Sequence, residues 1–192
     1  MSKKTTLLPA LVVALGQIGF LSWMIMARAA VLRDGREVLL KVEPVDPRDL
    51  LRGDYVRLGY EISSIPANLF RNLDDTGIRP DASVTVRLSR RSDGFWHATD
   101  AWIGQPTDAA STDAVDISGK ATSGFFGSED NQVVSIDYGL ERFYLPEGEG
   151  LAIERDMRTR NFGVKAAVAA DGASQIKALM DGDTMLFEEP LY

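Results

Sequence analysis

The sequence predicts a mainly β protein of the α+β class, in which one N-terminal transmembrane helix precedes an antiparallel-sheet domain. We expect this domain to be a sandwich or barrel-like, with one or two short helices. An uncharged apolar stretch fills residues 7–27, apolar and polar residues alternate over much of the chain after it, and Gly, Pro and Asp clusters separate the alternating segments. Alternation with period two is typical of half-buried strands, whereas about 20 continuous apolar residues are typical of a membrane helix. We therefore divide the chain into a cytoplasmic tip with the membrane helix, residues 1–29, and an exported β-rich domain, residues 30–192.

Composition narrows the class of protein. The chain has 192 residues, a formal net charge of -7, 45% apolar residues and no cysteine. Ordinary apolar content excludes an intrinsically disordered chain, and the lack of cysteine excludes disulfides, thiol nucleophiles and thiolate metal sites. An acidic chain lacks the basic face with which proteins bind phosphate backbones, so we expect no nucleic-acid partner.

The apolar stretch at residues 7–27 has the length of a membrane span. In an α-helix it rises roughly 30 Å, which matches the hydrocarbon core of a bilayer. Lys3 and Lys4 precede it, and we expect Pro9 in the first turn, where its missing N–H costs little. A cleaved signal peptide is the alternative, because residues 27–29 read Ala-Arg-Ala, but the apolar run is longer than the usual segment of about 7–15 residues. We predict an uncleaved membrane anchor that holds the C-terminal domain on the far side of the membrane from the N-terminus.

One face of the predicted membrane helix carries small and polar residues. Ala10, Ala14 and Gln17 follow one another at spacings of four and three. In lipid, such a face lets two helix backbones approach closely and form an interhelical hydrogen bond. Two interpretations stay open: a contact with another membrane helix, and a lone anchor with chance alanines.

Strand, turn and helix signals follow one another in the exported domain. The alternation predicts strands over residues 38–42, 55–62, 84–89, 95–103, 115–122 and 134–141. The strands over residues 84–89 and 95–103 form a predicted hairpin, a second hairpin follows over residues 164–179, and a last short strand comes after residue 183. Helical spacing after Ser64 as N-cap predicts a helix over residues 65–73, and acidic residues early with basic residues late predict another over residues 146–161. We expect loops over residues 104–112 and 123–131, and a bulge near Gly139.

Carboxylates are the only abundant reactive side chains. The sequence contains no GxSxG, HExxH, P-loop or GxGxxG string. Asp54, Glu147 and Glu154 are the candidate catalytic carboxylates, because paired carboxylates perform acid–base chemistry or hold Ca²⁺ or Mg²⁺. A solvated surface is the alternative for all three. We expect the single histidine, His97, to be structural or exposed rather than catalytic, and we expect neither a cofactor nor a bound metal.

Residues 53–60 read Gly-Asp-Tyr-Val-Arg-Leu-Gly-Tyr, which fits the pattern G-D-Y-x-x-L-x-Y. The chain resembles the bacterial GDYXXLXY family, which is named after this pattern. Residues 45–52, and residues 144–150 together with Glu154, resemble two further recurrent blocks of that family. The resemblance implies a short membrane-anchored protein of unassigned activity, often encoded beside a polytopic membrane protein. It therefore implies a lipid bilayer and a polytopic membrane protein as partners. It also implies a single-pass location in the bacterial inner (cytoplasmic) membrane, with the C-terminal domain periplasmic or extracellular.

Alternation divides this motif between two faces of a strand. Leu58 and Tyr60 are expected in the core, with Tyr55, Arg57 and Glu61 on the opposite face. We predict that this opposite face lies across a cleft from Glu147 or Glu154. The complete predicted binding surface comprises Arg52, Gly53, Asp54, Tyr55, Arg57, Leu58, Tyr60, Glu61, Pro146 and Glu147.

Two functions follow as expectations. The first is a non-enzymatic accessory or assembly protein, whose exported domain docks to another envelope membrane protein. The second is an envelope hydrolase that uses the candidate carboxylates with a metal ion or water. We favour the first, because the sequence presents no evident nucleophile, metal cluster or phosphate loop.

Overall fold

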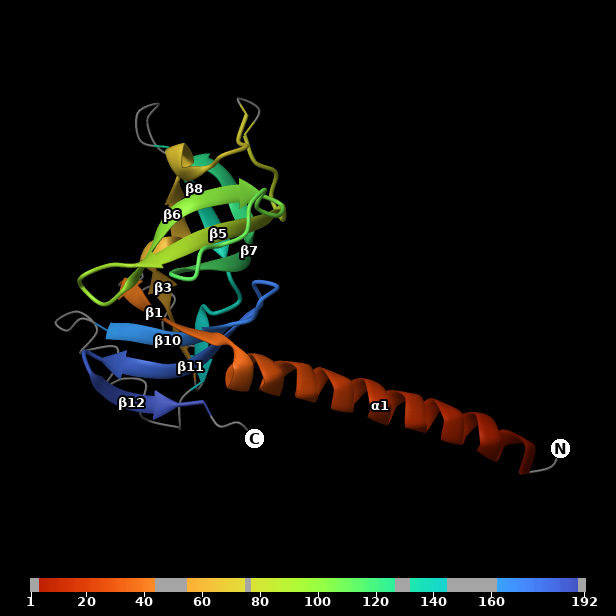
Figure 1. Cartoon of the computed structure of the whole chain (residues 1–192). Helices are drawn as coiled ribbons and strands as arrows, with labels where there is room; N and C mark the ends of the chain where they lie inside the picture. The colour runs from red at the N-terminus through yellow and green to blue at the C-terminus, as the bar shows by residue number, and fades with distance from the viewer. Residues whose placement is uncertain (1–3, 44–54, 75–76, 127–131, 145–161, 190–192) are drawn as a thin grey trace.

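The computed structural model describes residues 4–43, 55–74, 77–126, 132–144 and 162–189 of the chain. In this part a long helix, α1 (Lys4–Asp34), projects from a domain built mostly of β-strands (Figure 1). Two five-stranded antiparallel sheets and a two-stranded ribbon form the domain, and neither five-stranded sheet closes into a barrel within the described residues. The predicted mainly β fold with an N-terminal apolar helix is therefore confirmed.

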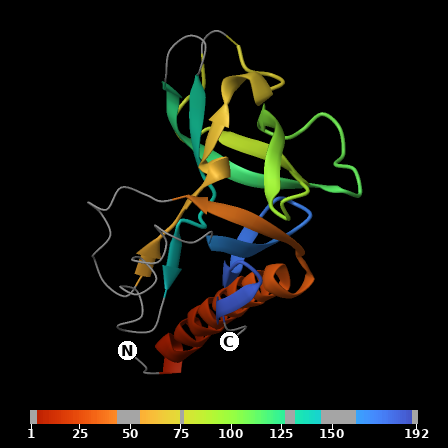
Figure 2. The same ribbon diagram turned by 90° about the vertical axis from the view of Figure 1, so that its left-hand side faces the viewer.

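The strands are distributed over two sheets, which Figure 2 shows one above the other. The first sheet, in the order β12-β11-β10-β1-β3, consists of β1 (Arg36–Glu43), β3 (Gly59–Tyr60), β10 (Phe162–Val168), β11 (Ser174–Asp181) and β12 (Thr184–Glu188). The second, in the order β4-β8-β7-β5-β6, consists of β4 (Ser64–Pro66), β5 (Ser83–Arg90), β6 (Trp96–Ile103), β7 (Ala114–Phe126) and β8 (Val133–Asp137). The ribbon pairs β2 (Tyr55–Arg57) with β9 (Arg142–Tyr144), and two 3-10 turns, η2 (Glu61–Ser63) and η3 (Ala67–Leu69), flank β4.

One apolar core connects the two sheets. Leu40, Val164 and Leu179 of the first sheet, and Val86 and Ile117 of the second, have no exposed surface. Burying an aliphatic side chain of this size contributes about 1.5–3 kcal/mol relative to leaving it exposed. The shared core is therefore what holds the two sheets together.

The two hairpins that the sequence predicts most clearly are confirmed. Strand β5 pairs with β6, and β10 pairs with β11. Gly94 and Gly172 lie in the connecting turns with φ of 89° and 85°, a conformation that glycine adopts without the steric cost of a Cβ.

The helix predicted over residues 65–73 is wrong. Its first residues form β4, in which Ile65 pairs with Val134 of β8, and only the single turn η3 follows. Ile65 precedes Pro66, and the residue before a proline is disfavoured in the helical region of backbone conformation. Leu69 and Leu73 still pack against the core, so their spacing reflects burial rather than a helix.

The strand predicted over residues 55–62 is divided in the structure. Strand β2 pairs with β9, whereas β3 pairs with β1, so the chain changes partner at Leu58. Strand β7 is longer than predicted and includes the first four residues of the expected loop 123–131. Gly139, where we expected a bulge, has a φ of 75° and follows the end of β8 at Asp137. The helix predicted over residues 146–161 lies outside the described residues.

The end of α1 is fixed to the first sheet. Leu32 is buried, and the Arg28 guanidinium donates to the Glu189 carboxylate at 3.1 Å. The Gly35 N–H closes the helix on the Val31 carbonyl at 2.9 Å. A Cβ at Gly35 would clash with that carbonyl oxygen, so the close approach requires glycine. Domain and helix therefore meet at an ordered junction.

The remainder of α1 carries apolar side chains that the domain does not cover. The segment Pro9–Asp34 is long and apolar enough to span a membrane, and its most apolar window has no buried residue. Eleven large apolar side chains between Leu11 and Met26 are exposed. Pro9 lies in the second turn rather than the first, because the helix begins earlier than predicted, at Lys4.

Candidate functional site

Few of the predicted site residues lie where the structure describes their side chains. Arg52, Gly53, Asp54, Pro146, Glu147 and Glu154 are outside the described residues, and only the backbone of Tyr55 and Arg57 is described, in β2. The predicted cleft between the motif and Glu147 or Glu154 therefore stays a prediction. Ala10, Ala14 and Gln17 are exposed on α1. Leu58 and Tyr60 are buried as expected, and Glu61 lines a pocket.

Glu61 belongs to a cluster of charged groups around the single histidine. His97 in β6 is 8% exposed, its Nδ1 lies 2.6 Å from the Glu61 carboxylate, and its Nε2 lies 2.9 Å from the Asp93 carboxylate. Lys41 of β1 approaches the other Glu61 oxygen at 3.4 Å. The cluster thus connects η2, the β5–β6 turn and the first sheet.

Both ring nitrogens of His97 are engaged by acceptors. Each contact joins one ring nitrogen to a carboxylate oxygen at hydrogen-bond distance. Neither nitrogen is then available to take a proton from a substrate hydroxyl. Partial desolvation raises the pKa of Asp93, but hydrogen bonds from His97 and from the Phe95 N–H lower it more, so the pKa lies below its usual value. This geometry orients and fixes His97 in β6.

A pocket of about 590 Å³ lies beside this cluster. Its lining comes from η2, β4 and η3 on one side and from the beginning of β6 on the other. Ile62 and Ile65 are buried apolar members of the lining, while Asn68, Arg91 and Gln132 supply polar groups. The volume is within the range of about 300–1,000 Å³ that is usual for ligand pockets.

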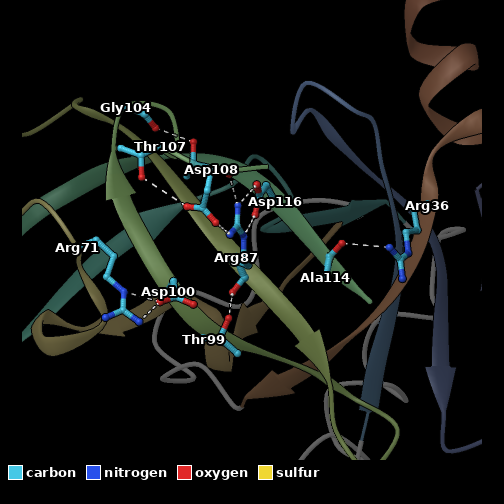
Figure 3. Close-up of polar contacts among 11 residues, drawn as sticks. Arg36, Arg71, Arg87, Thr99, Asp100, Gly104, Thr107, Asp108, Ala114 and Asp116 are labelled. Atoms are coloured by element: carbon cyan, nitrogen blue, oxygen red, sulfur yellow. Dashed lines mark hydrogen bonds and ion pairs between the residues drawn. The ribbon is translucent and has the colours of Figure 1, made fainter. Parts of the chain in front are cut away.

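A second charged cluster surrounds Arg87 of β5, which is 9% exposed (Figure 3). Its guanidinium donates to both carboxylate oxygens of Asp116 at 2.8 and 2.9 Å, to the Asp108 carboxylate at 2.6 Å and to the Asp108 carbonyl at 2.7 Å. It also lies over the Trp102 ring, with 4.8 Å from Cζ to the centroid. Hydrogen bonds to Asp116 raise the pKa of Arg87, and those to Asp108 raise it further, against the opposing effect of burial.

The Arg87 cluster fixes the segment that joins β6 to β7. Asp108 lies in that connection, and Asp116 lies in β7, so one side chain ties the connection to the sheet. A second pocket of about 590 Å³, which Asp34, Asp108 and Asp171 help to line, lies beside it. The described carboxylates of this pocket include no group of three or more that could hold a metal ion.

Comparison with known proteins places the chain in a family. The family model described as "GDYXXLXY protein" matches residues 17–179. The chain belongs to the GDYXXLXY family. No significant match was found among curated proteins or among solved structures.

In this GDYXXLXY protein, the end of the motif is attached to the turn that follows β8. The Tyr60 hydroxyl donates to the Leu140 carbonyl at 2.6 Å, and the Leu58 N–H donates to the Glu141 carbonyl at 2.9 Å. The Tyr138 hydroxyl donates in the opposite direction, to the Ile62 carbonyl at 2.8 Å. Burial raises the pKa of both tyrosines well above the usual value, so both remain hydroxyl donors. Leu58 and Tyr60 therefore connect the motif to the core and to the turn after β8.

Glu141 is the described carboxyl whose protonation is most perturbed. Burial, followed by a hydrogen bond with Asp137, raises its pKa to about 7, although its carboxylate also accepts the Tyr138 N–H at 2.8 Å. A carboxyl with a raised folded-state pKa binds its proton more tightly in the folded than in the unfolded chain. The protonated Glu141 side chain therefore makes its full contribution to the free energy of unfolding below pH 4.5, the ordinary pKa of a glutamate. This contribution is lost as the pH rises through about 7.

We predict that Glu141→Gln stabilises the protein at pH 8 by about 1–2 kcal/mol and has little effect at pH 4.5. The full pKa difference corresponds to about 3 kcal/mol, and we discount it because the carboxyl is partly exposed. Urea titration of the full-length chain in mild detergent, followed by fluorescence of the buried Trp96 and Trp102, measures the difference. Glu188→Gln, at an exposed position in β12, is the matched control. Equal effects of Glu141→Gln at both pH values would contradict the assignment.

Proposed function

We propose that this GDYXXLXY protein is a non-catalytic binding module, anchored in the bacterial inner membrane by α1. Its domain lies on the periplasmic or extracellular side and docks to another envelope membrane protein of the polytopic kind. A uniformly apolar helix needs an apolar environment around its whole circumference, and the exposed side chains of α1 find none in the domain. This bare helix is the observation that carries the proposal.

The junction between helix and domain supports docking close to the bilayer. Leu32 is buried in the domain and Arg28 is bound to Glu189, whereas the exposed apolar series ends at Met26. The domain thus begins within about two turns of the last apolar position, at 1.5 Å per residue. A partner that binds α1 in the membrane would also contact the domain surface near the lipid headgroups.

The His97 cluster favours binding over catalysis. A general base needs a nitrogen within reach of the substrate, and both nitrogens of His97 are held by carboxylates. The hydrolase alternative depends on Asp54, Glu147 and Glu154, which lie outside the described residues, so it stays a prediction.

Site-specific crosslinking in cells tests the proposal. A photo-crosslinking amino acid at Gln17 samples the face formed with Ala10 and Ala14, and the same group at Leu15, two residues away and about 200° around the helix, is the matched control. We expect an adduct with one polytopic membrane protein from Gln17 and a clearly weaker one from Leu15. Identical products at both positions, adducts with lipid alone, or full-length chain in the soluble fraction would each overturn the proposal.

A further inference from the structure

The edge strands of the second sheet, β4 and β6, lie on opposite sides of one pocket. We call the gap between them the seam, and only one end of it is closed by hydrogen bonds. At one end of the seam, Phe70 forms a parallel bridge with Ala101 of β6, and the Arg71 N–H donates to the Ala101 carbonyl at 2.9 Å. The Asn72 side chain completes this end by exchanging two hydrogen bonds with the Ile103 backbone, at 2.8 and 2.9 Å. The chain after η3 therefore already pairs along part of the free edge of β6.

The other end of the seam is open at Ala98. The Arg91 N–H donates to the Phe95 carbonyl at 2.9 Å, which directs the backbone polar groups of Phe95 toward β5. Directions alternate along an antiparallel strand, so the backbone of His97 also faces β5 and the N–H of Ala98 faces the seam; the register shifts after Ala98, at Thr99. No strand in the described part of the chain pairs with β6 on that side. An edge of this kind is a template for another extended chain.

The pocket of about 590 Å³ lies along this open part of the seam, and Ala98 is in its lining. Two of its polar members suit the backbone of an extended chain. Asn68 and Gln132 carry amide side chains, which both donate and accept hydrogen bonds as a peptide backbone does.

Arg91 gives the pocket its charge preference. Other cations near the seam are paired: Lys41 with Glu61, and Arg71 with Asp100. Arg91 has no ion pair with any described carboxylate, and Glu61 is already bound by Lys41 and His97. An exposed guanidinium in the wall of a pocket binds a carboxylate well, because it offers a planar, bidentate set of donors.

We propose that this seam binds an extended acidic peptide segment of the membrane partner. The segment adds to the free edge of β6 at Ala98 and places a carboxylate against Arg91, and its neighbouring side chains alternate between the apolar floor and solvent. The inference rests on the proposed function, because it names the chemistry by which the partner is recognised.

Peptide binding to the full-length chain in mild detergent tests the inference. The probe is a labelled, blocked pentapeptide, Thr-Val-Asp-Val-Thr, and fluorescence anisotropy measures its binding. A second peptide has lysine in place of aspartate, and a third has N-methylated valines, which removes backbone donors and keeps the side chains. We expect the aspartate peptide to bind at least tenfold more tightly than either of the others. We also expect it to slow amide exchange at Ala98.

Charge reversal at the site supplies the matched comparison. Arg91→Glu should reverse the preference, so that the lysine peptide binds more tightly than the aspartate peptide. Arg90→Glu, at an exposed position in β5 that is not part of the pocket lining, should leave the preference unchanged. The inference is overturned if the two variants behave alike, if the wild-type chain does not bind the aspartate peptide, or if the N-methylated peptide binds equally well. If Gln17 crosslinks the polytopic partner while the peptide tests fail, the seam inference alone is wrong.

Discussion

Replacing Tyr60 by alanine should lower the free energy of unfolding by about 4 kcal/mol. Tyr60 is 2% exposed and packs in the shared core, so truncation leaves a cavity of aromatic size. Tyr60→Phe should cost less, about 1–2 kcal/mol, because it retains the ring and deprives only the Leu140 carbonyl of its donor. Urea titration in detergent at constant pH, followed by the fluorescence of the buried Trp96 and Trp102, gives both values.

The comparison decides what the last residue of the GDYXXLXY motif does. If Tyr60 is a structural residue, both variants that remain folded should still crosslink the membrane partner through Gln17. A Tyr60→Phe chain of unchanged stability that loses the crosslink would instead make this hydroxyl a binding group. Tyr138→Phe is the natural control, because its hydroxyl makes the opposite bond, to the Ile62 carbonyl, from an equally buried position.

Sequence reasoning predicts strands well where apolar and polar residues alternate. Val84, Val86 and Leu88 alternate with polar residues and are all fully buried in β5. Glycine with positive φ at Gly94 and Gly172 marks the two hairpin turns, so neighbouring strands in sequence pair with each other. These elements depend on local pattern and local turns, which a sequence displays directly.

Elements that depend on distant partners could not be predicted in this way. The motif strand is divided at Leu58 because β2 pairs with β9, which comes later in the sequence, whereas β3 pairs with β1, which comes earlier. The segment after Ser64 has helical spacing, yet it pairs with β8 about 70 residues later. Local propensity is overridden in both places by hydrogen bonding that only the complete sheet provides.

The same limit applies to the candidate site. Alternation places Glu61 on the polar face of the motif strand, but its partner His97 is 36 residues away, and no local pattern connects the two. Alternation over residues 84–89 places Arg87 opposite the apolar side chains, and it is nevertheless buried, because carboxylates 21 and 29 residues later reach it. Its one local signal is an aromatic partner, Trp102, on the neighbouring strand of a predicted hairpin.

Arg87→Met should lower the free energy of unfolding by about 3 kcal/mol. Methionine retains much of the aliphatic packing on Trp102. It leaves Asp116, whose side chain is 19% exposed, without a counter-charge. Removal of one member of a buried ion pair typically costs about 3–5 kcal/mol. We choose the lower end because the Asp108 side chain is 63% exposed and can be solvated. Arg87→Lys should recover only part of the loss, because an ammonium cannot bind Asp116 in a bidentate manner and reach Asp108 as well.

Arg90→Met is the control for this prediction, since Arg90 lies at the exposed end of the same strand and should change stability by no more than about 0.5 kcal/mol. Amide exchange separates the local from the global consequence. In the Arg87→Met chain, amides in the connection that contains Asp108 should exchange faster under native conditions, because Arg87 ties that connection to β7. The β10–β11 hairpin should retain its protection. Equal stability of the Arg87→Met and Arg90→Met chains would mean that desolvating three charges at this cluster offsets all the energy of its hydrogen bonds.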